Sequence, residues 1–384
     1  MKPTDFKTLT AIYDRPAPAK DNEWVLGLDI GYSGIKGFCS NRISCFPSYA
    51  HKIPDNQVIL REPSPNDIRY RDESGTWVVG ELAYEEVHTS DVMDSESELF
   101  GRHRYYSSLF RVISRVGLAL GYSANQYGSP QGKQFIVQAG LPPKYLNDDA
   151  QDVREAISGH HNFQLQIGQN PWKEYIFDLS KSDIHFMPQP LGALLSASIG
   201  KDGVKVSDAQ KFFSKNVIVF DPGFGTLDDY FIRNGRVIGS GETFQNLGMR
   251  EVFSRTCKDI KNLHGITISI PELQTKLETG EIRVVDRKRM KSKKYSISGI
   301  LEKNCNNVGI EAMEKMKSVH NYFEDTDILV AAGGTYEAWK HIISDTFADM
   351  EDIEIVPANI NDPSLSNVFS IARGYYFYRL NKGV

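Results

Sequence analysis

The sequence predicts an α/β protein with two similar lobes that close on one ligand. Segments typical of strands alternate along the chain with segments typical of helices, which is the pattern of an α/β fold. The 384 residues exceed what one hydrophobic core usually accommodates, so two domains are expected. One acidic, glycine-rich turn also occurs twice, in residues 26–36 and 217–228, where an apolar run is followed by an Asp, a spacer and a Gly.

The repeated turn indicates the kind of ligand that the two lobes share. Asp29 and Asp221 both fall where a buried strand should end. A phosphate chain suits glycine turns, because bare backbone N–H groups can approach it closely. Two carboxylates beside phosphates imply a divalent metal ion, since like charges would otherwise repel one another.

The first half of the chain has the pattern of a strand-rich lobe. Tight turns separate three successive strands, and a later strand opens onto an acidic helix. A helix with one buried face is expected where apolar residues recur at helical spacing, and a short helix should begin after Pro190. The expected strands are 24–30, 35–40, 43–49, 77–83 and one from 134 that Gly and Pro stop at 140–143, with a hairpin at 166–178 and helices at 105–120 and 191–199.

The second half repeats this strand order and then becomes helical. Asn234-Gly235 is a strong hairpin signal between its second and third strands. Residues 201–215, before the first of these strands, are polar and resemble an insertion, and the last helix would return to the first lobe. The expected strands are 217–220, 227–234, 236–240 and one from 327, with helices at 249–263, 269–279, 307–322, 336–345 and 367–380.

Composition and charge exclude several classes of protein. Apolar residues make up 40% and charged residues 24%, as in ordinary soluble proteins. The formal net charge of −5 argues against a protein whose main role is to grip DNA. No stretch approaches a transmembrane span, and residues 1–22 lack the apolar core of a signal peptide. We therefore expect a cytoplasmic protein with no membrane partner and a loose, polar N-terminal extension at residues 1–23.

The four cysteines indicate free thiols. They are scattered, without a C-x-x-C pair, at Cys39, Cys45, Cys257 and Cys305. Cys39 and Cys45 could meet across a hairpin, but reduced thiols are expected in the cytoplasm.

Four motifs, in order along the chain, resemble one protein family. The first turn has a Gly two residues after Asp29 and Lys36 seven residues after it, and residues 221–228 match D-x-G-x-x-T-x-D. Residues 187–194 resemble the family's connecting helix, which carries a Gln or Glu at its start, and residues 328–335 resemble its adenosine motif. Together these motifs resemble the bacterial actin-like ATPases of the ParM/StbA plasmid-segregation type, within the superfamily of actin, sugar kinases and heat-shock chaperone ATPases.

The resemblance runs from about residue 24 to the C-terminus and implies a two-lobed actin-like fold. Each lobe would be a ribonuclease-H-like mixed sheet flanked by helices, with the nucleotide in the cleft between the two domains. Residues 24–186 with the C-terminal helix 365–384 would form the first domain, and residues 187–364 the second. Weaker echoes of the family lie at residues 46–48, 79–83, 140–143 and 277–282.

The resemblance assigns the first turn to the β- and γ-phosphates of a nucleotide. Asp29 would hold Mg²⁺ through water, because this ion keeps several of its waters. Lys36 would place its ammonium on the phosphates as a mobile point charge. Taken alone, an Asp-x-Gly at a strand end is most often a plain turn, and a lysine there is usually solvated. The backbone N–H groups that would face phosphate oxygens are those of Gly31, Tyr32, Ser33 and Gly34.

The second turn would contact the phosphates from the side opposite the first turn. Asp221, with Asp228, would complete the water shell of the metal or orient the attacking water. The alternative for Asp228 is a residue that only caps a turn. Asp29, Asp221 and Asp228 are thus the expected metal residues, acting mainly through water. The nucleotide-binding residues of this turn would be Gly223, Phe224, Gly225 and Thr226.

Gln189 is the predicted water-positioning residue. Phosphoryl transfer to water needs mostly a positioned nucleophile, and a Gln at the head of a helix can both accept from and donate to that water. Because the amide is neutral, it is no strong base, and slow turnover is expected. The candidate catalytic residues are therefore Gln189, Asp221 and Asp29, while the alternative for Gln189 is a solvent-exposed residue at a helix start.

The sugar and base would lie deeper in the cleft. Paired glycines would let the ribose approach the backbone, and the helix after them begins with an anion-favouring N-terminus. Arg250 would stack on adenine or form an ordinary surface ion pair. Adenine is implied by the family, and the sequence does not exclude GTP. The residues assigned to this part of the site are Asn246, Gly248, Arg250, Gly333, Gly334, Thr335 and Tyr336.

Two departures from known nucleotide motifs bear on the assignment. No G-x-x-x-x-G-K-[ST] motif occurs, since residues 128–134 have the wrong spacing and lack the Ser or Thr. Actins have Ser where Tyr32 stands, so the hydroxyl contact to the γ-phosphate would fall to Ser33.

A run of basic residues remains outside these motifs. Three interpretations stay open: a solvated hairpin, a nucleic-acid contact, and a protrusion that meets an acidic patch on a neighbouring subunit, for which residues 91–98 are a candidate. The run comprises Arg283, Arg287, Lys288, Arg289, Lys291, Lys293 and Lys294, followed by Tyr295.

The resemblance implies a polymerising ATPase that uses ATP, or GTP, with Mg²⁺ and forms filaments that segregate plasmid DNA. The DNA would be reached through a separate adaptor protein on a centromere-like site. The alternatives are an actin homologue that positions phage or cell components, a small-molecule kinase of the same superfold, a chaperone-like ATPase, and a nucleotide-locked scaffold. A kinase would need an Asp base where Gln189 stands, and a chaperone would need a further peptide-binding domain, which we do not expect after Val384.

Overall fold

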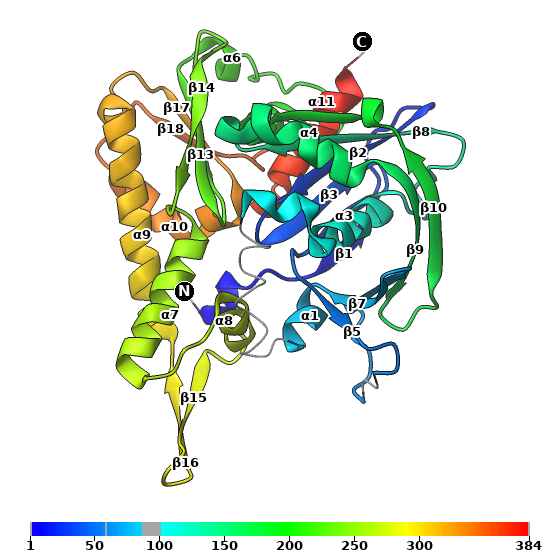
Figure 1. Ribbon diagram of the computed structural model, residues 1–384. Coiled ribbons are helices and arrows are strands. Elements are labelled where there is room, and N and C mark those ends of the chain that lie inside the picture. Colours follow the sequence, from blue (N-terminus) through cyan, green and yellow to red (C-terminus); the bar gives the residue numbers. More distant parts are fainter. Residues whose placement is uncertain (1, 58–59, 87–100, 383–384) are drawn as a thin grey trace.

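Two mixed β-sheets with the same strand order form the centres of the two lobes (Figure 1). The computed structural model describes residues 2–57, 60–86 and 101–382. In each sheet the first two pairings are antiparallel and the last two parallel. The first lobe has the order β4 (Arg42–Pro47), β3 (Gly34–Cys39), β2 (Glu23–Ile30), β8 (Gln134–Leu141), β11 (Ile184–Pro188), and the second β14 (Arg236–Gln245), β13 (Thr226–Arg233), β12 (Val217–Pro222), β17 (Ile328–Ala331), β18 (Glu354–Pro357).

Smaller sheets extend both lobes. The first lobe carries a second, five-stranded sheet, and the second lobe carries a two-stranded hairpin. The five-stranded sheet has the order β10 (Lys173–Leu179), β9 (Gly159–Ile167), β6 (Ile68–Asp72), β7 (Gly75–Val79), β5 (Ala50–Ile53). The hairpin consists of β15 (Glu281–Asp286) and β16 (Lys291–Ser296) and projects away from both lobes.

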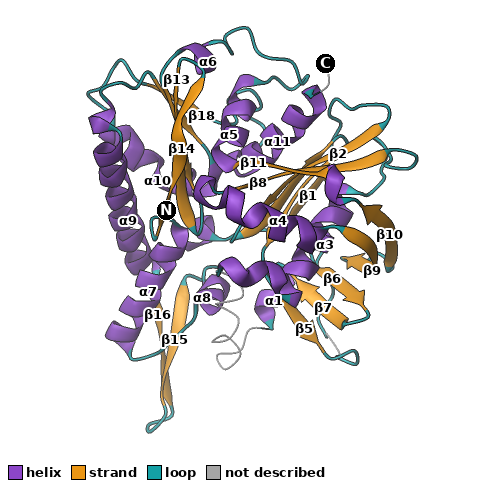
Figure 2. Ribbon diagram, turned by 45° about the horizontal axis from the view of Figure 1, so that its top comes forward, coloured by secondary structure: helices purple, strands orange, loops and turns teal. Residues whose placement is uncertain are grey.

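Helices cover both faces of each central sheet, as Figure 2 shows. The first lobe contains α1 (Glu81–Glu85), α3 (Ser108–Gly121) and α4 (Leu146–Ile157). The second contains α6 (Lys211–Ser214), α7 (Met249–His264), α8 (Ile270–Lys276), α9 (Ser298–Val319) and α10 (Gly333–Thr346). Two more helices, α5 (Gln189–Ser198) and α11 (Ser370–Asn381), lie between the two central sheets.

Alternation along the strands explains these layers. In β12, Ile218 and Phe220 belong to the core under α7, α9 and α10, while Val217 and Val219 face α5. Successive strand residues point to opposite faces, so a strand buried on both sides has no polar face. The first lobe is built alike, with α3 on one face of its sheet and α11 on the other.

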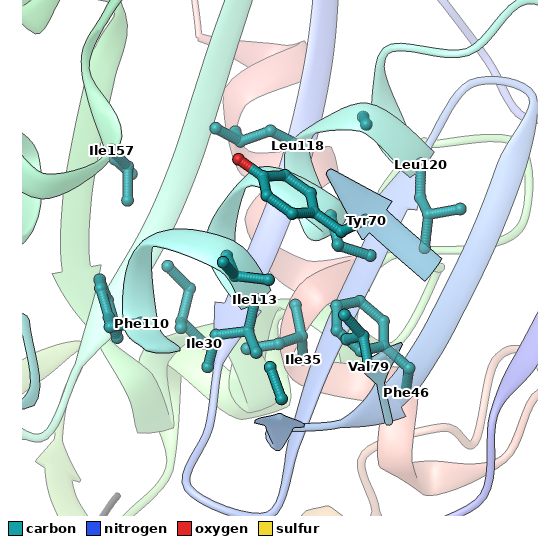
Figure 3. Close-up of a cluster of buried hydrophobic side chains, with 14 of the residues drawn as sticks. Ile30, Ile35, Phe46, Tyr70, Val79, Phe110, Ile113, Leu118, Leu120 and Ile157 are labelled. Carbon is teal, nitrogen blue, oxygen red and sulfur yellow. The ribbon is translucent and has the colours of Figure 1, made fainter. Parts of the chain in front are cut away.

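Figure 3 shows the core beneath α3. Phe110 and Ile113 of α3 pack with Ile35 of β3 and Tyr70 of β6, and all four are at most 2% exposed. This cluster joins the central sheet to the second sheet of the first lobe. The predicted α/β fold, with two lobes of mixed sheet flanked by helices, is confirmed.

The two lobes are joined where α5 crosses α11. A Cβ at Gly374 would overlap the carbonyl oxygen of Gly192, and a Cβ at Gly192 would lie 2.6 Å from the ring of Tyr375. The glycines therefore let the two helix backbones touch. The predicted return of the C-terminal helix to the first lobe is confirmed by Tyr376 and Phe377, which pack with Phe38 of β3.

The N-terminal extension departs from the prediction. It is not loose: it forms the 3₁₀ turn η1 (Pro3–Phe6) and the strand β1 (Ala11–Asp14), which pairs antiparallel with β4. Its polar sequence hid this order, because β1 adds to the edge of a sheet and buries little apolar surface of its own. Residues 201–215 also contain structure, since Phe212 of α6 is buried in the second lobe.

Some predicted boundaries differ from those observed. Helix α9 begins nine residues before the predicted residue 307, because Leu301, Cys305 and Val308 continue its buried face through polar neighbours. All four cysteines are free, and Cys39 and Cys45 are buried. Among the described residues, no helix has the length and apolarity needed to cross a membrane. The domain boundaries at 186/187 and 364/365 stay a prediction.

Candidate functional site

A cavity of about 940 Å³ lies between the lobes. Both glycine-rich turns line it, together with the ends of β2 and β12 and the start of α10. A second, open hollow of about 370 Å³ lies by β6 and β9 and contains none of the predicted site residues. The predicted residues that line the larger cavity are Asp29, Gly31, Tyr32, Ser33, Lys36, Gln189, Asp221, Gly223, Phe224, Gly225, Thr226, Asp228, Gly333, Gly334 and Thr335.

The hairpin of β2 and β3 explains the spacing of the first turn. Its register places Asp29 directly opposite Lys36. Residues opposite one another on antiparallel strands have neighbouring side chains, and Nζ of Lys36 lies 3.1 Å from Oδ2 of Asp29. Burial would lower the pKa of Lys36, but the charge of Asp29, with smaller contributions from Cys45 and Asp221, raises it above its ordinary value. The ammonium is therefore kept charged at the mouth of the turn.

Gln189 shares the same carboxylate. It is the first residue of α5, directly after β11, and its Nε2 donates to Oδ1 of Asp29 over 3.1 Å. Asp29 thus holds Lys36 with one oxygen and Gln189 with the other. The carbonyl oxygen of the Gln189 amide is left to accept a hydrogen bond from a water or a ligand.

The second turn has the same hairpin geometry and the opposite electrostatics. The register of β12 and β13 places Asp221 directly opposite Asp228, so two acids occupy the positions held by Asp29 and Lys36 in the first turn. Both are buried, with exposed fractions of 4% and 2%. Burial, followed by the charges of Asp228 and Asp29, raises the pKa of Asp221 well above its usual value.

Only one carboxylate oxygen of Asp228 accepts a hydrogen bond from the described residues. Thr226 donates to its Oδ2 over 2.9 Å, while Oδ1 is buried and has no hydrogen-bond partner among the described residues. Burial raises the pKa of Asp228 to about 7, against hydrogen bonds from Thr243 and Thr226 that lower it.

The two turns touch through Tyr32. A Cβ at Gly225 would lie 2.6 Å from the Tyr32 ring, so only a glycine admits this ring edge. The guanidinium of Arg104 lies 4.1 Å from the centre of the same ring and donates to the carbonyl oxygen of Ile30 over 2.6 Å. Arg104 thereby holds the first turn in place at the point where it meets the second turn.

Sequence reasoning missed two residues that brace the first turn. Arg104 is 5% exposed, and no local motif marks it. Ser48 donates from its hydroxyl to the carbonyl oxygen of Gly31 over 2.7 Å, and its N–H donates to that of Ser33 over 3.0 Å. The weak family echo at residues 46–48 was the available signal for Ser48.

The adenosine motif lies beside Asp221. The contact is made by Gly333, near the end of this motif: it has φ of +78°, a conformation that glycine adopts without strain, and a Cβ there would lie 3.0 Å from Oδ1 of Asp221. Thr335 donates to the carbonyl oxygen of Gly223 over 3.1 Å and so ties the start of α10 to the second turn.

Five predicted residues do not line the cavity. Tyr336 is 3% exposed and belongs to the core of the second lobe. A Cβ at Gly248 would lie 2.5 Å from the carbonyl oxygen of Phe224, and the backbone N–H of Arg250 donates to the same oxygen over 2.8 Å. These contacts support the second turn from outside. The five are Gly34, Asn246, Gly248, Arg250 and Tyr336.

The acids of the cavity suit a cation that is held at a distance. No group of three or more His, Cys, Asp or Glu side chains in the described part of the chain could hold a metal directly. Asp221 nevertheless faces two other carboxylates, and Oδ1 of Asp228 lacks a partner. A hydrated Mg²⁺ fits this donor set, because it binds carboxylates through its waters and would offset their mutual repulsion.

Comparisons with known proteins point to one fold. A model of the actin-like protein N-terminal domain matches residues 27–192. Two solved structures similar to the whole chain are a non-polymerisable quadruple mutant of pCBH ParM, with a TM-score of 0.69 and 18% identity, and a 15-stranded ParM filament from Clostridium botulinum, with 0.68 and 17%. Each comparison covers 93% of this chain and 99% of the other.

A third similar structure is Ta0583, an archaeal actin homolog, with a TM-score of 0.60, 15% identity, and coverage of 93% of this chain and 99% of that one. A search of curated protein sequences found no significant match. The predicted actin-like fold is confirmed by these structures and by the N-terminal domain model.

Proposed function

We propose that this actin-like protein, which shares its fold with the ParM proteins, is a nucleotide-dependent ATPase that assembles into filaments. One observation carries the proposal: Asp29, Lys36, Gln189, Asp221 and two glycine-rich turns from different lobes line a single cavity. Its volume of about 940 Å³ suits a nucleotide-sized ligand. Neither lobe alone holds the full set, so the ligand would bridge both.

The residues of the two turns would bind the phosphates. N–H groups from residues 31–33 and 223–226 would face the phosphate oxygens, and Lys36 would add a charge already held in place by Asp29. Magnesium, held through water near Asp29, Asp221 and Asp228, would neutralise charge on the phosphates. Gln189 would position the attacking water with its carbonyl oxygen, since its N–H is held by Asp29.

A ligand that bridges two lobes favours their closed state, and hydrolysis loosens it. Head-to-tail stacking of closed subunits is a heterologous contact that does not close on itself and so makes filaments. Two of the similar structures support this part of the proposal, since one is a ParM filament and the other is a ParM mutant made non-polymerisable.

The basic run suits one of these filament contacts. It lies on the β15–β16 hairpin, where Arg283 and Lys294 stand directly opposite one another on the two strands. Lys294 pairs with Glu281 over 2.9 Å, whereas the whole basic run is exposed to solvent, which favours a role in binding an acidic partner. The chain is itself acidic, so a second copy offers such a partner. The candidate acidic residues 91–98 lie outside the described residues.

Plasmid segregation in the cytoplasm, through an adaptor protein on a centromere-like DNA site, is the biological role we infer from the ParM resemblance. The net charge of −5 favours an adaptor over direct binding to DNA. A small-molecule kinase is less well supported, because the neutral amide of Gln189 stands where a kinase needs a base.

The proposal is tested by assembly and hydrolysis together. Purified protein at tens of micromolar should scatter light and pellet with ATP or a non-hydrolysable analogue, and disassemble as ADP forms.

Gln189→Ala should slow phosphate release about 100-fold while nucleotide binding is retained. Lys293→Glu with Lys294→Glu should weaken assembly and spare hydrolysis by the monomer. Absence of any nucleotide-dependent assembly would rule out the filament, and unchanged phosphate release in Gln189→Ala would remove this residue from the mechanism.

A further inference from the structure

We propose that residues 3–14, the N-terminal strap, latch the two lobes together across the nucleotide cavity and slow release of the nucleotide. The inference rests on the proposed nucleotide function and adds its regulation. The strap precedes the segment that matches the actin-like domain model, which begins at residue 27. It nevertheless contributes an unbroken stretch of the cavity wall, from Asp5 to Ala11.

One end of the strap is anchored on the second lobe. Phe6 is 9% exposed and belongs to the core cluster that otherwise consists of residues 218–347. Pro3 packs on Gly280, at the base of the β15–β16 hairpin, where a Cβ would lie 3.0 Å from its ring. This anchor is apolar and buried, so it supplies most of the attachment on this side.

The other end is built into the first lobe. Strand β1 pairs with β4 over four residues, from Ala11 opposite Cys45 to Asp14 opposite Arg42. Just before it, the N–H of Thr10 donates to Oε2 of Glu81, at the start of α1, over 2.8 Å. Main-chain pairing of this kind does not depend on one side chain, so the strap should stay on the first lobe when the second-lobe anchor is released.

Lys7 sits between the two anchors and bridges the lobes. Its Nζ lies 2.7 Å from Oε2 of Glu278 in the second lobe and 3.5 Å from Oε1 of Glu81 in the first. The next residue, Thr8, packs its methyl group 3.0 Å from the position of a Cβ at Gly34, in the first phosphate turn. The crossing point thus lies directly beside the phosphate-binding part of the cavity.

The strap crosses the cavity on the side away from the hinge. The lobes are joined by α5 and α11, and Gln189 and Ile371 of these helices line one part of the cavity. Ala11 of the strap packs on the cluster that includes α11, but Lys7 contacts α1 and Glu278 near α8, and both helices lie far from α11 in the two ribbon views (Figures 1 and 2). Opening about the hinge would move Glu81 and Glu278 apart and so would pull Lys7 and Phe6 from one partner.

The release rate of a fluorescent nucleotide tests this latch. N-methylanthraniloyl-ATP is bound to the full-length protein and displaced by excess ATP in a stopped-flow instrument. Phe6→Ala should release it about tenfold faster or more, because the buried anchor is removed. Glu278→Gln should accelerate release about two- to fivefold, since only a part-exposed ion pair is lost. Added salt should accelerate release from the wild type more than from Glu278→Gln.

Asp325→Asn is the matched control. Asp325 is 68% exposed and pairs with Arg233 over 2.7 Å on the outer part of the second lobe, whereas Glu278 is 65% exposed and pairs with Lys7 over the same distance. The control should release nucleotide at the wild-type rate. Glu278 is a surface residue, so its variant tests the latch even if Phe6→Ala fails to fold.

The outcomes separate the latch from the proposed function. Normal binding with wild-type release in both Phe6→Ala and Glu278→Gln would overturn the latch alone. Equal acceleration by Asp325→Asn would also overturn it, because the effect would then be one of surface charge. No binding of the analogue to the wild type would overturn the nucleotide function, and the latch with it.

Discussion

The two glycine-rich turns share one hairpin geometry and differ in charge. In each, an Asp ends one strand and stands opposite the residue seven positions later. In the first turn that residue is Lys36, and in the second it is Asp228. The first pair is an ion pair of 3.1 Å, while the second is a pair of buried acids with raised pKa values.

This difference assigns separate tasks to the two turns. The first is electrostatically complete before any ligand arrives, because Asp29 already has Lys36 and Gln189 as partners. The second lacks a compensating cation, and Oδ1 of Asp228 has no partner in the described residues. The first turn therefore presents a fixed positive charge and an oriented amide, and the second presents an incomplete acidic site that a hydrated cation would complete.

Asp29→Asn should produce the largest change in stability. It leaves Lys36, whose side chain is 15% exposed, without its partner, and breaking a buried pair costs about 3–5 kcal/mol. The free energy of unfolding of the nucleotide-free protein, measured with urea, should fall by that amount. Adding Lys36→Met should restore most of it, whereas an unchanged unfolding midpoint in the single variant would show that the first turn is not held by this pair.

Asp228→Asn should act in the opposite direction. The folded-state pKa of Asp228, about 7, lies above its ordinary value of 3.8, so its contribution to stability is full below about pH 4 and is lost as the pH rises through 7. Without nucleotide, the variant should be more stable than the wild type at pH 8 by about 2–4 kcal/mol. This advantage should shrink by about 2 kcal/mol at pH 5.5.

His161 also makes stability depend on pH, but it does so equally in the wild type and in Asp228→Asn. Burial lowers its pKa to about 4, so it removes stability as the pH falls from 6.5 towards 4. Both proteins contain His161, and its effect cancels in their difference. If the gain in the free energy of unfolding of Asp228→Asn did not change with pH, the raised pKa would be contradicted. Adding Mg²⁺ with ADP should reduce this gain.

Gly225→Ala should have the smallest effect. The added methyl group meets the Tyr32 ring at 2.6 Å and would push the two turns apart at their contact. We expect nucleotide affinity to fall about tenfold, at the lower end of what overpacking costs. Tyr32→Ala in the same chain should restore affinity, and a double variant as weak as Gly225→Ala would show that the turns do not act through this contact.

The repeated glycine-rich turn in the sequence predicted most of the fold. An apolar run, an Asp and a glycine turn mark the end of a buried strand wherever they occur, so two copies predicted two equivalent sheets. The same pattern predicted that Asp29 and Asp221 meet at one ligand, the family resemblance added Gln189, and all three line one cavity. The resemblance also includes Gly248 and Tyr336, which do not line the cavity, because a motif does not distinguish the wall of a site from the layer behind it.

By itself, the sequence determined the two lobes, the two turns and the acids at their strand ends, because these depend on local patterns of apolar residues, Asp and Gly. Only the tertiary structure decided what each acid meets. The pairing of Asp221 with Asp228 depends on strand register, the clamp of Arg104 on Tyr32 joins residues 72 positions apart, and Lys7 reaches Glu278 across the cavity. Such contacts leave no mark in a local pattern, since each residue alone is an ordinary polar side chain.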